Sequence, residues 1–190
     1  NPLHCPLRAS QQSSYSSLRG GVASGMSSLI RRLPQAMYTP SGKWQSANSR
    51  PGSHPPVTFD YPGHHNQGVR LQDLIAQDCS SLIVGGTDRV FAQTGLQKIT
   101  FRIMVSGYTS PFFGIELELI NLASHGPITR AKLGQLVAAN FARFIEVHSS
   151  TKSSEPAWAA GRIRFDMLSL ISLINTCDEN WQADIYVDFR

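Results

Sequence analysis

The stretch ITFRIMVSGYTSPFFGIELELI, residues 99–120, indicates two β-strands joined by a turn. Apolar and polar residues alternate on both sides of Pro111, and a period of two is typical of strands with one buried face. The polar positions carry Arg102, Glu116 and Glu118. The fold and the function both depend on whether this charged face is a site or the solvated side of a sheet.

Three further segments complete the predicted fold. Thr129 is a suitable N-cap for a helix that runs to about Val147, because apolar residues recur behind it at helical spacing. Residues 167–176 are apolar on both faces, as in a central strand, although a buried helix has the same pattern. Residues 181–189 alternate cleanly and predict a last strand. The order ββαββ predicts an α+β fold, with one long helix packed on one face of a four-stranded, mainly antiparallel sheet.

Charge divides the chain unevenly. Residues 1–59 contain no Asp or Glu, and six basic residues: Arg8, Arg19, Arg31, Arg32, Lys43 and Arg50. Residues 60–190 contain eleven basic and thirteen acidic residues, so the N-terminal part carries about +6 and the rest about −2, which adds to the net charge of +4. We therefore expect a basic, Ser/Gly/Pro-rich arm over 1–66 that is disordered unless bound, a transition with a short helix or strand over 67–97, and a folded domain over 98–190.

The arm also bears on the subcellular localisation of the protein. Residues 18–33 predict a weak amphipathic helix, and an Arg-rich, Ser-rich, acid-free N-terminus is typical of a mitochondrial transit peptide. The three widely spaced cysteines (Cys5, Cys79 and Cys177) favour an intracellular, reducing compartment over a disulfide framework. No apolar run is long enough for a transmembrane segment. We expect Asn1 to be either a processed N-terminus or the start of a fragment.

Three stretches also carry a resemblance: TGLQKITFRI (94–103), PITRAKLGQLVAANFARFIE (127–146) and NTCDENWQADIYVDFR (175–190). Together they resemble a family of hypothetical proteins predicted from the genomes of mushroom-forming fungi, over roughly residues 90–190. The family's aromatic-rich turn after the first strand is matched only loosely by GYTSPFFG (107–114). The resemblance implies a fungal origin and one folded C-terminal domain, and it implies no activity.

A carboxylate site on the sheet is the enzymatic alternative. If the strands pair as predicted, Glu116, Glu118, Asp184 and Asp188 lie on the face away from the helix, where paired carboxylates serve as acid and base or bind a hard cation. Catalytic carboxylates need unlike, partly dry surroundings. An open sheet face offers neither, so we interpret this face as solvated and predict no catalytic residue.

Other motifs predict no cofactor and no metal site. The Gly20–Gly25 spacing lacks the Lys-Ser/Thr pair of a phosphate-binding loop, and no G-x-S-x-G sequence occurs. His54, His64 and His65 lie in a Pro/Gly-rich stretch, where ordinary loop histidines are the better interpretation.

Several residues are candidates for partner contacts. Arg130 and Lys132 would stand in the first helical turn, where the helix dipole disfavours cations. Aromatic residues in a turn tip either reach the core or anchor a partner. The candidate partner contacts are therefore Arg19, Arg31, Arg32, Phe112, Phe113, Arg130 and Lys132.

These observations favour a non-enzymatic structural or protein-interaction protein whose basic arm orders on a partner or on neighbouring copies. One alternative is weak, salt-sensitive binding of nucleic acid or another polyanion through residues 1–59. The other is an enzyme that uses the carboxylates of the sheet face.

Overall fold

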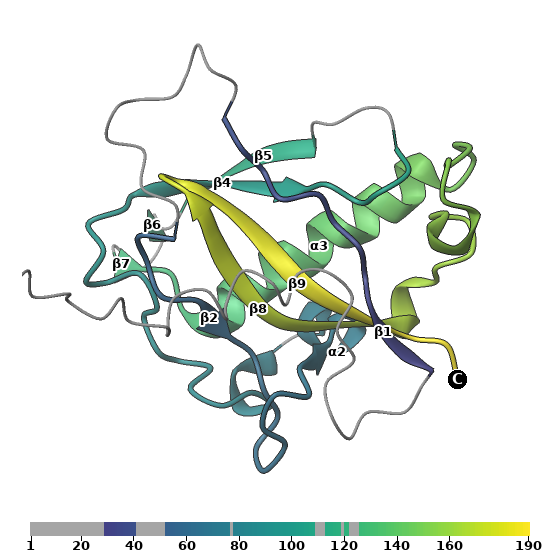
Figure 1. The fold of residues 1–190 in the computed structure, drawn as a ribbon. Helices are drawn as coiled ribbons and strands as arrows, with labels where there is room; N and C mark the ends of the chain where they lie inside the picture. Colours follow the sequence, from purple (N-terminus) through teal and green to yellow (C-terminus); the bar gives the residue numbers. More distant parts are fainter. Residues whose placement is uncertain (1–28, 41–51, 77, 109–112, 119, 122–125) are drawn as a thin grey trace, which may run out of the picture.

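The computed structural model describes residues 29–40, 52–76, 78–108, 113–118, 120–121 and 126–190 (Figure 1). For 113–118 and 120–121 it describes the backbone alone. Strands and helices contribute to one hydrophobic core, so the α+β class predicted from the sequence is confirmed. Within the described ranges no helix combines the length and the apolar character that crossing a bilayer requires.

The main sheet has more strands than predicted. It contains β1 (Ile30–Arg32), β2 (Val57–Thr58), β3 (Val69–Arg70), β4 (Lys98–Ile103), β5 (Phe113–Glu118), β8 (Leu168–Cys177) and β9 (Asn180–Asp188). The order is β2-β8-β9-β4-β5, with β3 also on β8 and β1 also on β9. All neighbours are antiparallel except β4 and β9. The four-stranded ββαββ arrangement is not confirmed, because three short N-terminal strands enlarge the sheet to seven.

The remaining elements are short, apart from one helix. They are α2 (Leu71–Ile75), α3 (Arg130–His148), the small β6 (Ile120–Asn121) and β7 (Gly126–Pro127) pair, and 3₁₀ turns at Cys79–Ser81, Pro156–Trp158 and Phe165–Met167. The Thr129 side chain accepts a hydrogen bond from the Lys132 backbone N–H, so the predicted N-cap of α3 is confirmed. Figure 1 shows α3 running across one side of the sheet.

The helix and the sheet meet through the predicted apolar stripes. Phe141 of α3 packs against Phe101 of β4, with ring centroids 6.1 Å apart. Leu133 and Trp181 are fully buried in the same core. Each buried side chain of this size contributes about 1.5–3 kcal/mol to the free energy of unfolding. This layer positions the outward-facing side chains of β8 and β9 on the opposite face.

Two parts of the predicted arm belong to the folded unit. β2 pairs with the outer edge of β8, and Val57 and Phe59 are buried beside it. Residues 30–33 are extended along β9, so this end of the predicted helix over 18–33 is a strand. The boundary predicted at residue 66 therefore lies inside the core, because unpaired strand edges recruit nearby chain whatever its mean polarity. Residues 1–28 and 41–51 lie outside the described part.

Residues 29–40 fill an opening in the sheet where β4 and β9 diverge. β4 and β9 pair only between Thr100–Arg102 and Asn180–Gln182. Beyond that point, Leu33 donates from its backbone N–H to the Ile185 carbonyl, while Ala36 donates to the Met104 carbonyl. The arm segment thus bonds to one strand and then to the continuation of the other.

Candidate functional site

The carboxylate of Asp184 lies at the centre of the predicted charged face. It accepts two hydrogen bonds from the guanidinium of Arg32, and the two side chains form an ion pair. Asp184 is only 5% exposed. Burial opposes the charge on Arg32, but the hydrogen bonds to Asp184 and its negative charge more than offset this, so the pKa of Arg32 is raised. Asp184 is a structural partner of the arm segment.

Further side chains of this face hold the same segment. Gln182 accepts a hydrogen bond from the Tyr38 backbone N–H and donates one to the Ala36 carbonyl, both at 2.9 Å. The guanidinium of Arg102 lies 3.8 Å from the centre of the Tyr38 ring, a cation–π contact. The interpretation of this face as solvated is therefore wrong around Asp184 and Gln182, because residues 29–40 cover it.

The four predicted carboxylates are not brought together. Asp184 and Asp188 are four residues apart on one strand, which separates them by about 13 Å. Glu116 is opposite Thr100, which is opposite Asn180, so Glu116 is about 16 Å from Asp184 by strand spacings. The side chains of Glu116 and Glu118 lie outside the described residues. Among the residues that are described, no His/Cys/Asp/Glu group has the arrangement of a metal site.

The predicted partner contacts differ in whether they are described, exposed or already paired. Arg19 and Phe112 lie outside the described part, as does the side chain of Phe113 in β5. Arg31 and Lys132 are exposed. Arg32 is occupied by Asp184.

Arg130 is also a structural residue. Its guanidinium donates to the carbonyls of Thr58 and Gly85 and lies 3.6 Å from the Asp88 carboxylate. These contacts tie the start of α3 to the loop after the 3₁₀ turn, which explains why a cation is tolerated in the first helical turn.

An open groove of about 630 Å³ lies on the face of the sheet opposite α3, beside the end of β9. We call it the outer groove. Its lining includes Tyr61 and Leu82 on one side, Tyr186 and Arg190 on the other, and Arg70. These residue types, aromatic rings and arginines around an exposed leucine, are those enriched in protein interfaces.

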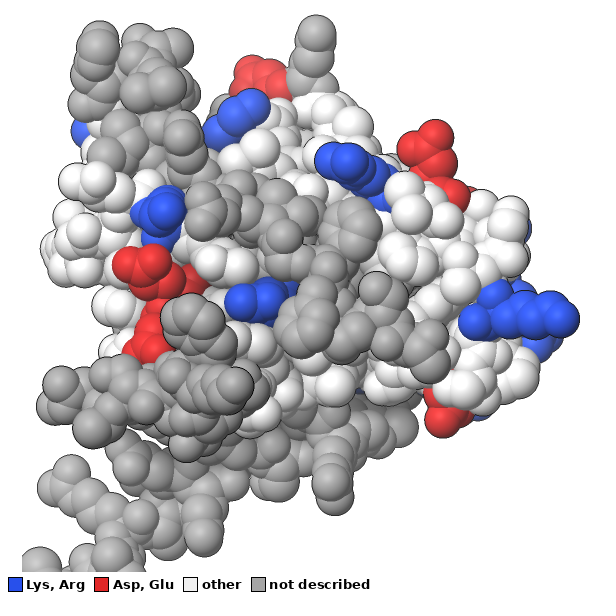
Figure 2. Space-filling model, turned by 90° about the horizontal axis from the view of Figure 1, so that it is seen from above, with Lys and Arg blue, Asp and Glu red and all other residues white. Residues whose placement is uncertain are grey.

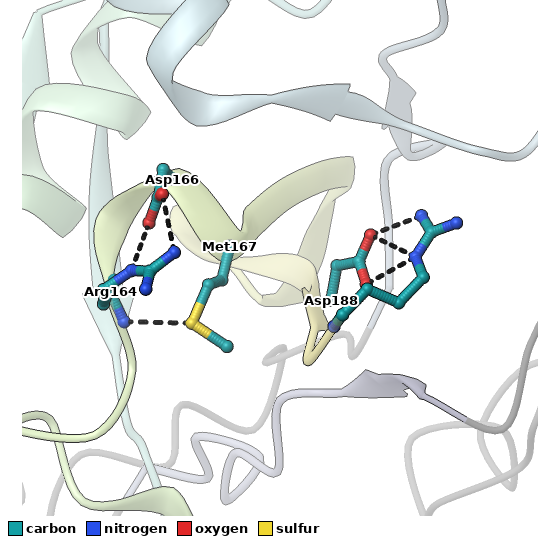
Figure 3. A network of polar contacts seen from close by, with 5 residues as sticks. Arg164, Asp166, Met167 and Asp188 are labelled. Atoms are coloured by element: carbon teal, nitrogen blue, oxygen red, sulfur yellow. Dashed lines mark hydrogen bonds and ion pairs between the residues drawn. The ribbon is translucent and has the colours of Figure 1, made fainter.

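The groove wall is held by fixed hydrogen bonds. The Tyr61 hydroxyl donates to Asp73 and accepts from the Arg70 backbone N–H. Burial and the hydrogen bond to Asp73 raise the pKa of Tyr61 to about 12. Asp188 accepts from Arg190, which lowers the pKa of that carboxyl (Figure 3).

Arg164 and Asp166 form a second exposed pair behind the groove. The guanidinium donates to both carboxylate oxygens at 3.0 Å, and this contact lowers the pKa of Asp166 (Figure 3). In both pairs the carboxylate is neutralised by an arginine that follows or precedes it by two residues, so neither is poised for acid–base chemistry.

A nucleophile and base do not meet in the groove. His64, Ser81 and Ser169 line it, yet no hydrogen bond in the described part of the chain joins His64 to either serine. An activated nucleophile needs its base within hydrogen-bond reach. The geometry of the groove suits binding through rings and guanidinium groups.

A second cleft, of about 350 Å³, lies on the other face of the β1–β9 pair. We call it the terminal cleft. Alternation along the strands produces this division, since Ile30 and Asp188 line the outer groove while Leu29, Arg31 and Phe189 line the terminal cleft.

Trp158 lines the terminal cleft together with Phe189. Its ring meets that of Phe189 edge-on, with centroids 5.7 Å apart, and both rings pack against the core.

Sequence reasoning missed the grooves but had a signal for them. The last strand was predicted with Tyr186 and Asp188 on one face and Val187 and Phe189 on the other. The pattern does not predict that Tyr61 lines the outer groove or that Trp158 lines the terminal cleft, because both residues are distant in sequence from the last strand. Tyr61 and Tyr186 of the outer groove, and Leu29 and Trp158 of the terminal cleft, are each more than a hundred residues apart in the sequence.

Comparisons with protein-family models, with curated proteins and with solved structures found no match to this chain. The resemblance to fungal proteins over residues 90–190 therefore stays a prediction, and the function rests on the geometry of the two clefts.

Proposed function

We propose that this chain is a non-enzymatic protein-interaction protein, and that the outer groove is its contact surface. The observation that carries this proposal is the grouping of Tyr61, Tyr186, Arg70 and Arg190 around the exposed Leu82. Tyrosine and arginine supply much of the binding free energy in protein interfaces, because they bury large areas and keep a polar end. The partner is another protein or a second copy of this chain.

The basic arm joins the described structure beside this surface. Ile30, in the described arm segment, lines the outer groove. Part of the arm, residues 29–40, is ordered on its own sheet and needs no partner. The contribution of the arm to partner binding that we propose therefore belongs to arm residues outside 29–40, among them Arg8, Arg19, Lys43 and Arg50.

The test compares two exposed apolar residues that are two positions apart. Leu82 lines the groove and Val84 does not, and they are 41% and 47% exposed. Leu82→Asp should weaken association at least tenfold, since it brings an unpaired carboxylate into the interface. Val84→Asp should leave association unchanged. Size-exclusion chromatography with light scattering over a range of protein concentrations measures self-association.

A partner other than a second copy is detected by a photo-crosslinking amino acid. It is placed at position 82 or 84 of the full chain, and the chain is irradiated in extract. A defined product from position 82 alone supports the proposal. A monomeric chain that gives no product, or equal products from both positions, refutes it.

Polyanion binding through the arm is the second candidate. Arg31 keeps an exposed guanidinium, whereas Arg32 is neutralised by Asp184. Figure 2 shows cationic and anionic groups interspersed over the described part of one face, where a nucleic-acid surface would be more uniformly basic. Five basic residues remain in the arm, so the slope of log K against log salt should not be steeper than about −4.5 for duplex DNA.

The subcellular localisation of the protein is also a proposal. Cys79 and Cys177 are both buried, and the wide spacing of the three cysteines supports the proposal of a reducing intracellular compartment. Mitochondrial import remains the alternative. A reporter fused behind residues 1–33 tests it, and a cytosolic reporter would remove it.

A further inference from the structure

We propose that the terminal cleft binds an acidic peptide segment that carries one or two large apolar side chains. The inference concerns a surface apart from the outer groove, so it stands or fails separately from the function proposed above. Six residues line the cleft: Leu29, Arg31, Ala157, Trp158, Arg162 and Phe189.

The charge of the cleft is one-sided. Arg31 and Arg162 are both exposed, and within the described part of the chain neither guanidinium forms a hydrogen bond or an ion pair. The neighbouring Arg32, Arg164 and Arg190 are each paired with a carboxylate. Among the described residues, no Asp or Glu lines the terminal cleft, whereas Asp188 lines the outer groove. The cleft therefore has two cations available to an incoming anion.

The floor between the two arginines is apolar. Trp158 and Phe189 meet edge to face, and Leu29 is 46% exposed beside them. A volume of about 350 Å³ accommodates one or two large side chains. An aromatic floor flanked by arginines is the composition of an interface hot spot, where a single apolar anchor is buried and charges at the rim fix its orientation.

Charge decides among the possible occupants. Residues 1–28, which precede Leu29 in the sequence, contain Arg8 and Arg19 and no acidic residue. Two like charges near two unpaired arginines would be repelled, whether the arm came from this chain or from a second copy. An acidic segment of another protein satisfies both the cations and the apolar floor, and it is the occupant to which we commit.

The probe is a fluorescein-labelled peptide, EELFEE, added to the full chain and followed by fluorescence polarisation. Two control peptides replace either the four Glu by Gln or the Leu-Phe pair by Ala-Ala. We expect saturable binding of EELFEE at low salt, at least tenfold weaker binding of each control, and weakening by added salt.

Matched variants locate the site. Arg31→Glu with Arg162→Glu should weaken binding at least tenfold. Lys132→Glu with Arg143→Glu changes the net charge equally on the exposed surface of α3 and should change binding less than twofold. Ala157→Glu adds a carboxylate to the cleft without removing an arginine, and it gives an independent reading if the first double variant does not fold.

Three results overturn the inference. They are the absence of saturable binding, equal weakening by the two double variants, and binding of phosphatidylserine vesicles without binding of EELFEE. None of these depends on Leu82, so a failure here is distinguishable from a failure of the outer groove.

Discussion

Replacing Arg32 by Met tests whether the arm segment is part of the fold. Asp184 is 5% exposed, and the guanidinium of Arg32 supplies both of its ion-pairing hydrogen bonds. Removing one member of a buried pair leaves the other charge uncompensated, which costs about 3–5 kcal/mol. A domain of this kind has a total free energy of unfolding of about 5–15 kcal/mol, so the loss is a large fraction of it.

Arg31 provides the matched control. It neighbours Arg32 in β1, is exposed, and makes no contact with a carboxylate within the described residues. Arg31→Met should change stability by no more than about 0.5 kcal/mol, as surface substitutions usually do. Both variants remove one positive charge from the same strand, so a difference between them reports the buried pair and not net charge.

Urea unfolding followed by tryptophan fluorescence measures the effect. With a slope near 2 kcal/mol/M, Arg32→Met should lower the midpoint by about 1.5–2.5 M. The double variant Arg32→Met/Asp184→Leu should be more stable than Arg32→Met alone, because no buried charge is left unpaired. If Arg32→Met and Arg31→Met unfold at the same midpoint as the unmodified chain, residues 29–40 are not docked on β9 and the assignment of Asp184 to a structural pair is wrong.

Three further predictions concern the groove wall and the arm segment. Gly68→Ala should destabilise the fold by about 2 kcal/mol or more, because φ is +76° and a Cβ would lie 2.7 Å from the Leu170 carbonyl oxygen. Gly63→Ala, where φ is +80° and the space for a Cβ is open, should cost about 1 kcal/mol. Thermal melts rank the two, and equal losses would contradict the close approach of residue 68 to β8. The Tyr61 hydroxyl holds its proton more tightly in the folded state, so its contribution to the free energy of unfolding is complete below pH 10 and is lost as the pH rises toward 12. The free energy of unfolding of Tyr61→Phe should therefore fall less over that window. Parallel pH profiles of the two proteins would refute this. Gln182→Leu removes two hydrogen bonds to the backbone of residues 36 and 38 and should cost about 2 kcal/mol, with faster amide exchange at Tyr38 measured by NMR and unchanged exchange in α3.

The fate of the charged face shows where sequence reasoning reaches its limit. The alternation of β9 correctly placed Asp184 and Gln182 on the side away from α3. It did not say what covers that side. Residues 29–40 mix apolar and polar residues without a strand period, and they pair with the sheet because the opening between β4 and β9 offers them backbone hydrogen bonds on both edges. Local composition carries no information about such an opening.

Arg130 is a second example of a residue whose contacts cannot be identified from the local sequence. A cation in the first turn of α3 is a local conflict with the helix dipole, and the sequence leaves open whether it marks a partner surface or is a tolerated cost of about a few tenths of a kcal/mol. Arg130 instead donates to two carbonyls of segments that lie up to 72 residues away in sequence. The partner was in the same chain, and only the tertiary contacts identify it.

The sequence by itself determined the long strands, the helix with its Thr129 cap and the α+β class, because periodicity and capping are local properties of the chain. Only the tertiary structure decided that part of the basic arm belongs to the sheet, that Asp184 is a structural partner of Arg32, and that the outer groove and the terminal cleft open on opposite faces of β1 and β9. These features depend on which distant segments meet, and the free energy of that meeting comes from backbone pairing and burial that no single stretch of sequence contains.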